Sequence, residues 1–566
     1  MDPARTTTRF EPPLGSWFLS QLQDRGTVMF TDEGILGTRK PAPENLATLV
    51  GREPKPEGFV SILFPTGSPR ELVEGEATRF LVDLQINQII AATVAGREQY
   101  QLKPYFYLPL QDLDVISYRH EVFNDLAQAK LRRVVDGFAR AMLEMRRDRA
   151  LADGFRDERQ RQAMLVDAAS IYCAAVTELN ETLADAAPAS RGLRAFGIYL
   201  AGYVKSSGFL AVVSDAAQVQ EALAKVRYCV GIKGNRVTVT REEDSADYTA
   251  EVRQTFERFS QGQVKDYRRQ NGKTIVDMNH VERWILDGVV QLFPGEFLAL
   301  QCFELTHTEF GNELVAAFDR EIQFYLAYLD LVAKPTAKGL SFCMPAVSHN
   351  KEVHAKETFD LALAIQIVAR ARSVVTNDID LGGIERILVV SGPNQGGKTT
   401  FARTFGQLHY LAALGLPVPG KQARLTLPDA IFTHFELGEN TKDLQGKLMD
   451  DLVRIHDILD AATPRSLLIL NEIFTSTTLG DAIDLGTRIF AQIQSTDLVC
   501  VCVTFVEELS RLGPTVVSMV STAEAENPAQ RTFKVVRQRA DGSAYAMVLA
   551  QKYGLDYGSL KGRINS

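Results

Sequence analysis

A glycine-rich loop in the second half of the chain has the residue types and spacing of a phosphate-binding P-loop. Its residues are Gly392, Pro393, Asn394, Gln395, Gly396, Gly397, Lys398, Thr399 and Thr400. The glycines would let backbone N–H groups turn toward phosphate oxygens. Lys398 would reach the β- and γ-phosphates, and the Thr399 hydroxyl would bind Mg²⁺. The alternative is a glycine-rich turn without a ligand. The complete motif in its context favours a site for a nucleoside triphosphate.

A second candidate group follows the apolar run 467–470. Glu472 would lie at the carboxyl end of this strand, where it could orient or deprotonate an attacking water. Asn471 precedes it, where such sites usually place an Asp that holds Mg²⁺ through water. An amide lacks the negative charge, so metal affinity should fall. The alternative for Glu472 is a solvated acid at a strand end, but its spacing from Lys398 favours the catalytic interpretation.

The polar segment after Glu472 is rich in hydroxyl groups and ends in Asp481. Such a segment could contact a nucleotide across a dimer interface. Taken alone, it would predict only a turn and a helix N-cap.

The elements that would position these residues alternate between short strands and helices, as in an α/β ATPase. The apolar run Ile387-Leu388-Val389-Val390 would be the strand before the P-loop, and residues 401–414 have helical apolar spacing. Further strands are predicted at 430–435, 467–470, 498–504 and 515–521. A final hairpin is predicted at 531–537 and 544–550.

Residues 1–338 differ from this part of the chain in composition and in the spacing of their apolar residues. Residues 1–79 are rich in Pro, Gly and charge and predict an arm or small irregular unit, with one short strand at 59–64. Residues 80–338 show helical spacing and predict long helices, interrupted by a β-hairpin at 228–240. The fold class predicted is therefore multidomain α plus α/β. A long-helix core or lever domain (80–338) would precede an ABC-type P-loop ATPase domain (339–566).

Composition limits the remaining possibilities. The chain has 566 residues, 45% of them hydrophobic and 23% charged, and a net charge of −8. This net charge argues against a protein coated in basic residues, although a local basic face could still bind nucleic acid. The sequence has no apolar run long enough to span a bilayer and no secretory signal at its start, so we expect a cytoplasmic protein without a membrane partner. The six scattered cysteines are expected to be reduced core residues.

These residues together resemble the MutS family of DNA mismatch-repair ATPases. The P-loop fits the family pattern Gly-Pro-Asn-x-Gly-Gly-Lys-Ser/Thr, and Asn377-Asp378-Ile379 and Asn471-Glu472-Ile473 are similar to family segments around it. The resemblance is strong over 374–563 and faint over 80–374. It implies binding and hydrolysis of ATP with Mg²⁺, and a homodimer in which the segment ending in Asp481 completes the partner's site.

The chain departs from the family pattern in several places. No Phe-x-Glu mismatch-reading motif occurs in residues 1–75, so we expect a MutS-like chain without the N-terminal mismatch-reading domain. Val374 stands where the family has an adenine-stacking aromatic residue. Phe505 stands where it has a histidine. These differences predict retained nucleotide binding with slow hydrolysis, and they argue against classical mismatch recognition.

A basic segment in the helical region is a candidate DNA contact. It contains Lys265, Arg268, Arg269 and Lys273. At the tip of a lever these residues could bind phosphates, although a charged run is more often a solvated loop. The leading hypothesis is a MutS-like ATPase whose dimeric clamp binds duplex, mismatched or branched DNA and is driven by ATP. The alternative is a nucleotide-gated scaffold that binds a protein partner without recognising mismatches.

Overall fold

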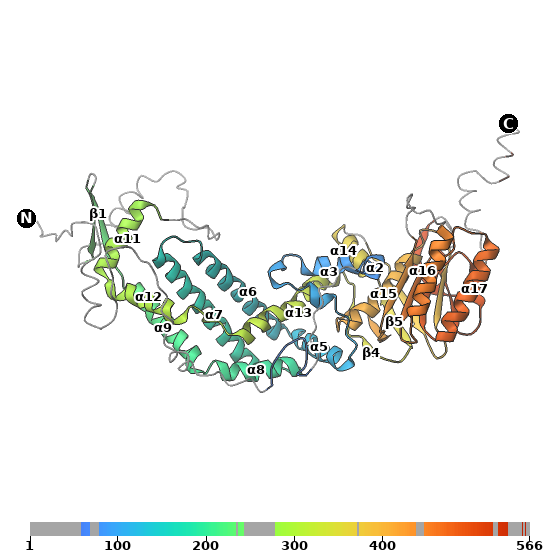
Figure 1. The fold of residues 1–566 in the computed structure, drawn as a ribbon, viewed down its shortest axis with the longest axis horizontal. Helices are drawn as coiled ribbons and strands as arrows, with labels where there is room; N and C mark the ends of the chain where they lie inside the picture. The colour runs from blue at the N-terminus through green and yellow to red at the C-terminus, as the bar shows by residue number, and fades with distance from the viewer. Residues whose placement is uncertain are drawn as a thin grey trace, which may run out of the picture. The chain divides into compact units, whose positions relative to one another are not determined.

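The computed structural model describes most of the chain (Figure 1). The described residues are 58–67, 78–233, 236–242, 278–370, 373–436, 447–524 and 530–540, together with 557 and 561. They divide into two compact units. Unit 1 comprises the described residues of 133–187 and 197–315, and unit 2 those of 59–132, 188–196 and 316–566. This division groups residues 80–132 and 316–338 with the C-terminal part of the chain. The domain ranges 1–79, 80–338 and 339–566 stay predictions.

Unit 1 is mainly helical. Its elements are most of α6 (Ala129–Ala152), α7 (Glu158–Ala186), part of α8 (Arg191–Tyr203), α9 (Ser207–Ala224), β1 (Tyr228–Lys233), β2 (Arg236–Arg241), α11 (His280–Leu292) and α12 (Pro294–His307). The carboxylate of Asp157 accepts hydrogen bonds from the backbone N–H groups of Arg159 and Gln160, which fixes the start of α7. Helices α7, α9 and α12 pack against one another.

The hairpin predicted at 228–240 is present as the antiparallel pair β1 and β2. Its strand β2 packs on α11 through Val239, Val289 and Phe293. The candidate DNA residues Lys265, Arg268, Arg269 and Lys273 lie outside the described residues.

Unit 2 contains the remaining elements. Its helices are α2 (Arg79–Asp83), α3 (Ile86–Val94), η1 (Glu98–Tyr100), α4 (Lys103–Phe106), α5 (Leu113–Leu126), most of α13 (Glu313–Ala337), α14 (Leu361–Ala369), α15 (Lys398–Ala413), α16 (Lys447–Ala461), α17 (Leu479–Thr496) and η2 (Glu507–Arg511). Its strands are β3 (Phe342–Cys343), β4 (Ala346–Ser348), β5 (Val353–Thr358), β6 (Asn377–Leu381), β7 (Ile387–Ser391), β8 (Val418–Pro419), β9 (Gln422–Thr426), β10 (Ile431–Phe435), β11 (Leu467–Asn471), β12 (Val499–Val503), β13 (Val516–Ala523) and β14 (Arg531–Arg537).

The largest sheet of unit 2 has the strand order β10-β11-β12-β7-β13-β14. The first five strands are parallel and coincide with the five strands predicted after residue 386. Strands β7, β11 and β12 are buried along their whole length, which explains their continuous apolar sequences. A smaller sheet has the order β4-β9-β5-β6, and β3 pairs with β8.

Helices cover the large sheet on both faces. One core cluster joins alternate residues of β7, β11 and β12 to α16 and α17, so these two helices lie on the same face (Figure 1). Helix α15 contacts β11 and β12 without taking part in that cluster, which places it on the opposite face. The P-loop connects β7 to α15 and therefore lies at the carboxyl ends of the parallel strands.

The edge strand β14 lies where a strand was predicted, at 531–537. It pairs antiparallel with β13, with an irregular register between Ser521 and Ala523. Its expected partner, 544–550, lies outside the described residues.

The segment Phe59–Phe64 is not the predicted strand. It is irregular, and its apolar side chains are buried in unit 2. Its polar groups are bonded individually: the Glu321 carboxylate accepts hydrogen bonds from the Ser61 hydroxyl (2.7 Å) and the Ile62 N–H (2.9 Å). The Arg119 guanidinium donates to Leu63 O. In this segment, side chains form the hydrogen bonds to the backbone that a neighbouring strand would form if the segment were a β-strand.

The cysteines only partly match their prediction. All six are free, and Cys173, Cys500 and Cys502 are buried, whereas Cys229 and Cys302 are exposed. Within the described part of the chain, no single helix has the length and apolar character to cross a membrane. Two bent pairs, α8 with α9 and α11 with α12, match a span by length and composition only.

Candidate functional site

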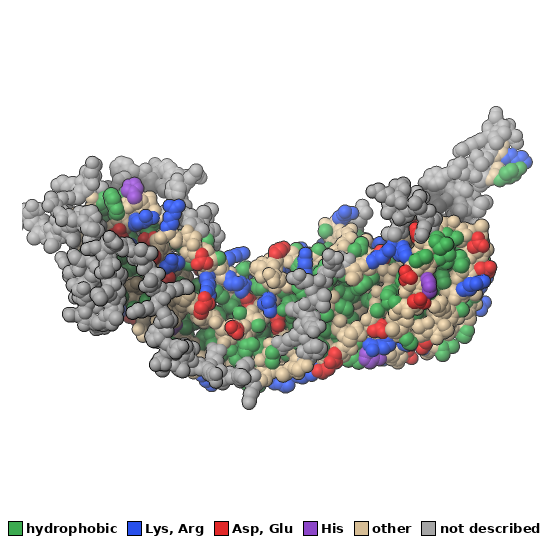
Figure 2. Space-filling model, viewed as in Figure 1, with side chains coloured by type: hydrophobic (Ala, Val, Ile, Leu, Met, Phe, Trp, Pro, Cys, Tyr) green, Lys and Arg blue, Asp and Glu red, His purple; other side chains and the backbone are tan. Residues whose placement is uncertain are grey.

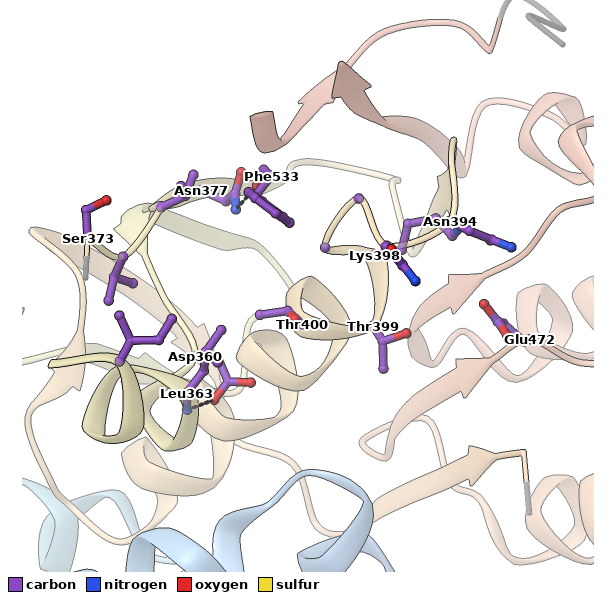
Figure 3. Close-up of a pocket in the computed structure, with 16 residues that line it drawn as sticks. Asp360, Leu363, Ser373, Asn377, Asn394, Lys398, Thr399, Thr400, Glu472 and Phe533 are labelled. Atoms are coloured by element: carbon purple, nitrogen blue, oxygen red, sulfur yellow. Dashed lines mark hydrogen bonds between the residues drawn. The ribbon is translucent and has the colours of Figure 1, made fainter. Parts of the chain in front are cut away.

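The P-loop lines a cavity of about 490 Å³ in unit 2 (Figure 3). Residues from four other parts of the unit complete the lining: helix α14 with its N-cap, the segment that leads into β6, the residue after β11 and strand β14. Of the predicted site residues, the structure brings seven P-loop residues and Glu472 to this cavity. The seven are Asn394, Gln395, Gly396, Gly397, Lys398, Thr399 and Thr400.

The glycines of the loop are required by its shape and by close packing on β13. Gly392 and Gly397 have φ angles of 115° and 94°, which side-chain-bearing residues rarely adopt. At Gly396 an added Cβ would lie 2.2 Å from the Ser521 hydroxyl oxygen, which itself donates a 2.7 Å hydrogen bond to Gly396 O. Only glycine therefore fits at position 396, and the hydrogen bond from Ser521 holds the loop backbone in place at this residue.

Lys398 points back onto the loop that precedes it. Its Nζ donates to Gly392 O at 2.9 Å, Pro393 O at 3.2 Å and Asn394 Oδ1 at 3.3 Å. The ammonium also lies 4.4 Å from the ring centroid of Phe505. Burial lowers the pKa of Lys398, the nearby Glu472 carboxylate opposes this shift, and the positive charge of Arg531 adds to it. Lys398 is thus a buried cation whose bonds are to uncharged oxygens, which suits it to a polyanion.

The side chains of Thr399 and Asn471 contact each other beside the P-loop. The Thr399 hydroxyl donates to Asn471 Oδ1 at 3.0 Å, and Asn471 is 7% exposed. Two hard oxygen donors at this separation fit the one or two protein ligands that Mg²⁺ usually takes beside phosphate and water. No group of three or more His, Cys, Asp or Glu side chains that could hold a metal occurs among the described residues. The oxygens present therefore fit Mg²⁺ that arrives with a phosphate ligand.

Glu472 follows β11 directly and lines the cavity opposite Lys398 and Thr399 (Figure 3). Its φ angle is +58°, an uncommon conformation for a residue with a side chain. Its N–H donates to Val503 O at 2.9 Å on the neighbouring strand. Such strain is retained where the surrounding structure determines it, often at functional sites.

Asp481 is not among the residues that line the cavity. Its carboxylate accepts hydrogen bonds from the hydroxyls of Thr477 (3.0 Å) and Thr478 (2.8 Å) at the start of α17. These bonds lower its pKa. Within one chain Asp481 belongs to a helix cap, which is the simpler of the two sequence interpretations. Its role toward a partner subunit stays a prediction.

The end of the cavity that lies away from Glu472 could be predicted from the sequence only at Val374. Leu363, Ile367, Val374 and Val375 form an apolar lining there, together with Phe533 from β14. Asp360 caps α14 by accepting from Leu363 N, and it also accepts from Gln407 Nε2 at 2.8 Å. Val374 does line the cavity at the position assigned by resemblance. Phe533 could not be assigned, since nothing in its local sequence indicates that β14 reaches the P-loop.

Comparison with known proteins agrees with this geometry. The family model for MutS domain V matches residues 388–561. The DNA mismatch repair protein MutS of Chlorobaculum tepidum is 24% identical over 493 residues, 80% of this chain and 55% of that protein. MutS of Shouchella clausii is 28% identical over 49% of this chain and 33% of its own length. The DNA mismatch repair protein msh3 of Aspergillus fumigatus is 37% identical over 21% of this chain and 10% of its own length. The chain thus spans about half, or less, of the length of these relatives.

Proposed function

Because this chain is a member of the MutS family, we propose that its P-loop binds ATP with Mg²⁺ and that unit 2 hydrolyses the nucleotide slowly. The observation that carries the proposal is the cavity where Lys398, Thr399 and Glu472 converge from α15 and the end of β11. In this reading unit 2 contains the P-loop ATPase domain predicted from the sequence.

Each residue has a distinct role in the proposal. Backbone N–H groups of the loop and Lys398 bind the phosphates, and Lys398 exchanges its bonds to loop oxygens for bonds to phosphate oxygens. The Thr399 hydroxyl and the Asn471 amide oxygen hold Mg²⁺, which would neutralise phosphate charge when bound. Glu472 orients the attacking water and accepts its proton. The neutral Asn471 and the apolar Phe505 support slow turnover.

We further propose that two chains pair through unit 2, with the segment before Asp481 reaching the partner's nucleotide. Support comes from half-exposed apolar side chains at Met449, Val453, Leu479 and Phe505. Figure 2 shows hydrophobic side chains gathered on the surface of the region that Figure 1 labels α16. Contiguous exposed apolar surface is typical of sites of protein association.

Two substitutions test the nucleotide chemistry. Lys398→Ala should abolish ATP binding in calorimetry, whereas Lys338→Ala, an exposed lysine outside the cavity, should not change it. Glu472→Gln should bind ATP normally, lose hydrolysis by about 10²-fold or more and accumulate as an ATP-bound dimer in sedimentation. Glu508→Gln is the matched control, because Glu508 is exposed and does not line the cavity. Normal turnover in Glu472→Gln would refute the role of that residue.

The relatives are named as DNA mismatch repair proteins, and we propose that this chain also binds DNA, as an ATP-driven clamp. Gel retardation of homoduplex, mismatched and branched DNA, with and without ATP, tests this. Contacts to phosphates should weaken steeply between 50 and 200 mM salt, by roughly 10³-fold for about six contacts. No retardation of any DNA would instead favour the scaffold hypothesis, which the relatives do not favour.

A further inference from the structure

Strand β14 runs beside the P-loop, although it is the edge strand of the sheet. Its first residue, Arg531, donates through Nε to Asn394 O at 3.2 Å. Two residues later, the Phe533 Cα lies 3.7 Å from where a Cβ on Gly397 would be. Strand β14 therefore contacts the glycine loop at two places, through a side chain at Asn394 and through its backbone at Gly397.

Phe533 is held in an uncommon backbone conformation. Its φ angle is +58°, which costs on the order of 1–3 kcal/mol for a residue other than glycine. Asn377 fixes this conformation from both sides: its Nδ2 donates to Phe533 O at 3.2 Å and its Oδ1 accepts from Val535 N at 2.8 Å. The result is an aromatic side chain that is 49% exposed and faces the cavity between Asn377 and Lys398 (Figure 3).

The cavity has two chemically different ends. The P-loop end presents Lys398 and backbone N–H groups, which suit phosphates. The other end presents the apolar side chains of Leu363, Ile367, Val374 and Val375. The buried Asp360 carboxylate lies beside them and accepts hydrogen bonds from Leu363 N and Gln407 Nε2. A nucleotide has the same polarity, with an anionic chain at one end and a flat base with apolar faces at the other. The cavity volume of about 490 Å³ is in the range typical of small-ligand sites.

We propose that β14 is a second nucleotide-binding element, in which the Phe533 ring packs on the base and the Arg531 guanidinium contacts the phosphates. The inference rests on the proposed ATP binding and names the residues that recognise the base. An aromatic ring stacked on a base contributes enough to change affinity by roughly 5- to 150-fold. Phe533 would thereby supply the aromatic stacking on the base that the aliphatic side chain of Val374 cannot supply.

The position of Arg531 supports the phosphate contact. Arg531 Nε donates to Asn394 O and Lys398 Nζ donates to Asn394 Oδ1, so both cations contact the same loop residue. Burial is the main cause of the lowered pKa of Lys398, and repulsion from Arg531 adds to it. A polyanion bound between them would relieve this repulsion and gain charge-assisted hydrogen bonds from both. Arg531 and Phe533 are two residues apart on one strand, which explains how a single element could reach both parts of the ligand.

Calorimetry of the full chain with Mg²⁺, using ATP and inorganic tripolyphosphate in parallel, tests the inference. Phe533→Gly is the decisive variant, because glycine adopts the positive φ angle without strain and only the ring is lost. It should bind ATP roughly 5- to 150-fold more weakly than the wild type and tripolyphosphate equally well. Phe533→Trp should keep ATP affinity, and its emission should change with ATP but not with tripolyphosphate. Arg531→Gln should weaken both ligands by a similar factor.

Two variants on the same strand are matched controls. Val536→Ala shortens an exposed side chain that does not line the cavity. Arg537→Gln removes an arginine that pairs with Glu385 instead of approaching the loop. Both should leave the affinities for ATP and tripolyphosphate unchanged.

The outcomes separate this inference from the proposed function. Unchanged ATP affinity in Phe533→Gly, or equal losses of ATP and tripolyphosphate, overturns the assignment of the base to Phe533. Unchanged tripolyphosphate affinity in Arg531→Gln overturns its phosphate contact. A wild-type chain that binds neither ligand refutes the proposed function itself.

Discussion

The contact between Gly396 and Ser521 gives a quantitative test of how β13 shapes the P-loop. A Cβ added at Gly396 would lie 2.2 Å from the Ser521 hydroxyl oxygen, 3.0 Å from Pro393 O and 3.3 Å from the Ser521 Cβ. The first distance is far inside van der Waals contact, so Gly396→Ala must displace the loop or the serine. Overpacking of this kind costs about 1–3 kcal/mol of folding free energy.

The same contact predicts how a second substitution compensates. Ser521→Ala alone removes the hydrogen bond to Gly396 O and should cost about 1 kcal/mol. In the double variant the hydroxyl is gone and the closest remaining contacts are 3.0 and 3.3 Å, which small shifts can relieve. The double variant should therefore cost about 1–2 kcal/mol less than the sum of the single variants.

Urea unfolding followed by circular dichroism measures these free energies, and ATP calorimetry reports whether the loop keeps its shape. Gly137→Ala in α6 is the control, because no atom lies within 4 Å of the added Cβ. It should stabilise its helix by about 0.5–1 kcal/mol. Additive costs in the double variant would refute the argument, because the clash with Ser521 would then not be the origin of the effect.

Three further predictions concern the metal site and buried polar groups. Asn471→Asp should lower the Mg²⁺ concentration needed for half-maximal ATP binding by roughly 5- to 10-fold, because a charged oxygen binds about 1 kcal/mol more strongly; an Mg²⁺ titration that matches the wild type would contradict the assignment of Asn471. Burial lowers the pKa of His409 to about 4, against about 6.5 when unfolded, so the stability it contributes is complete above pH 6.5 and is lost as pH falls toward 4. The wild type should thus lose roughly 1–2 kcal/mol from this residue between pH 7 and 5, and His409→Leu should flatten the pH profile of unfolding; equal slopes would show that another group is responsible. Arg119→Met should cost about 2–4 kcal/mol by leaving the buried Leu63 and Leu414 carbonyls without a donor, and an unchanged urea midpoint would exclude that role.

The sequence predicted those parts of the fold whose burial is uniform along the chain. The runs at 387–390, 467–470 and 499–503 are apolar at every position, because each strand lies between two layers of helices. The P-loop glycines, Lys398 and Thr399 were identifiable because close backbone approach and phosphate contact permit few alternatives.

The sequence could not predict features that depend on distant partners. Phe59–Phe64 has the composition of a strand, but its backbone is bonded to the side chains of Glu321 and Arg119 rather than to a neighbouring strand. Phe533 alternates with polar residues like any edge-strand residue. Its entry into the cavity depends on Asn377, which lies 156 positions earlier in the chain. The sequence pattern around Phe533 carries no information about a contact with so distant a residue.

The bonds of Lys398 show how binding can be favourable at a loop that is already satisfied. A phosphate chain must replace three acceptors, Gly392 O, Pro393 O and Asn394 Oδ1, all of them uncharged. These bonds are already charge-assisted because their donor is an ammonium, and an anionic phosphate oxygen would add the attraction between opposite charges. Under the proposed function, this attraction favours exchange of the three loop oxygens for phosphate oxygens. We propose that the glycine loop already has its binding shape and that Lys398 is the residue that moves when a phosphate chain binds.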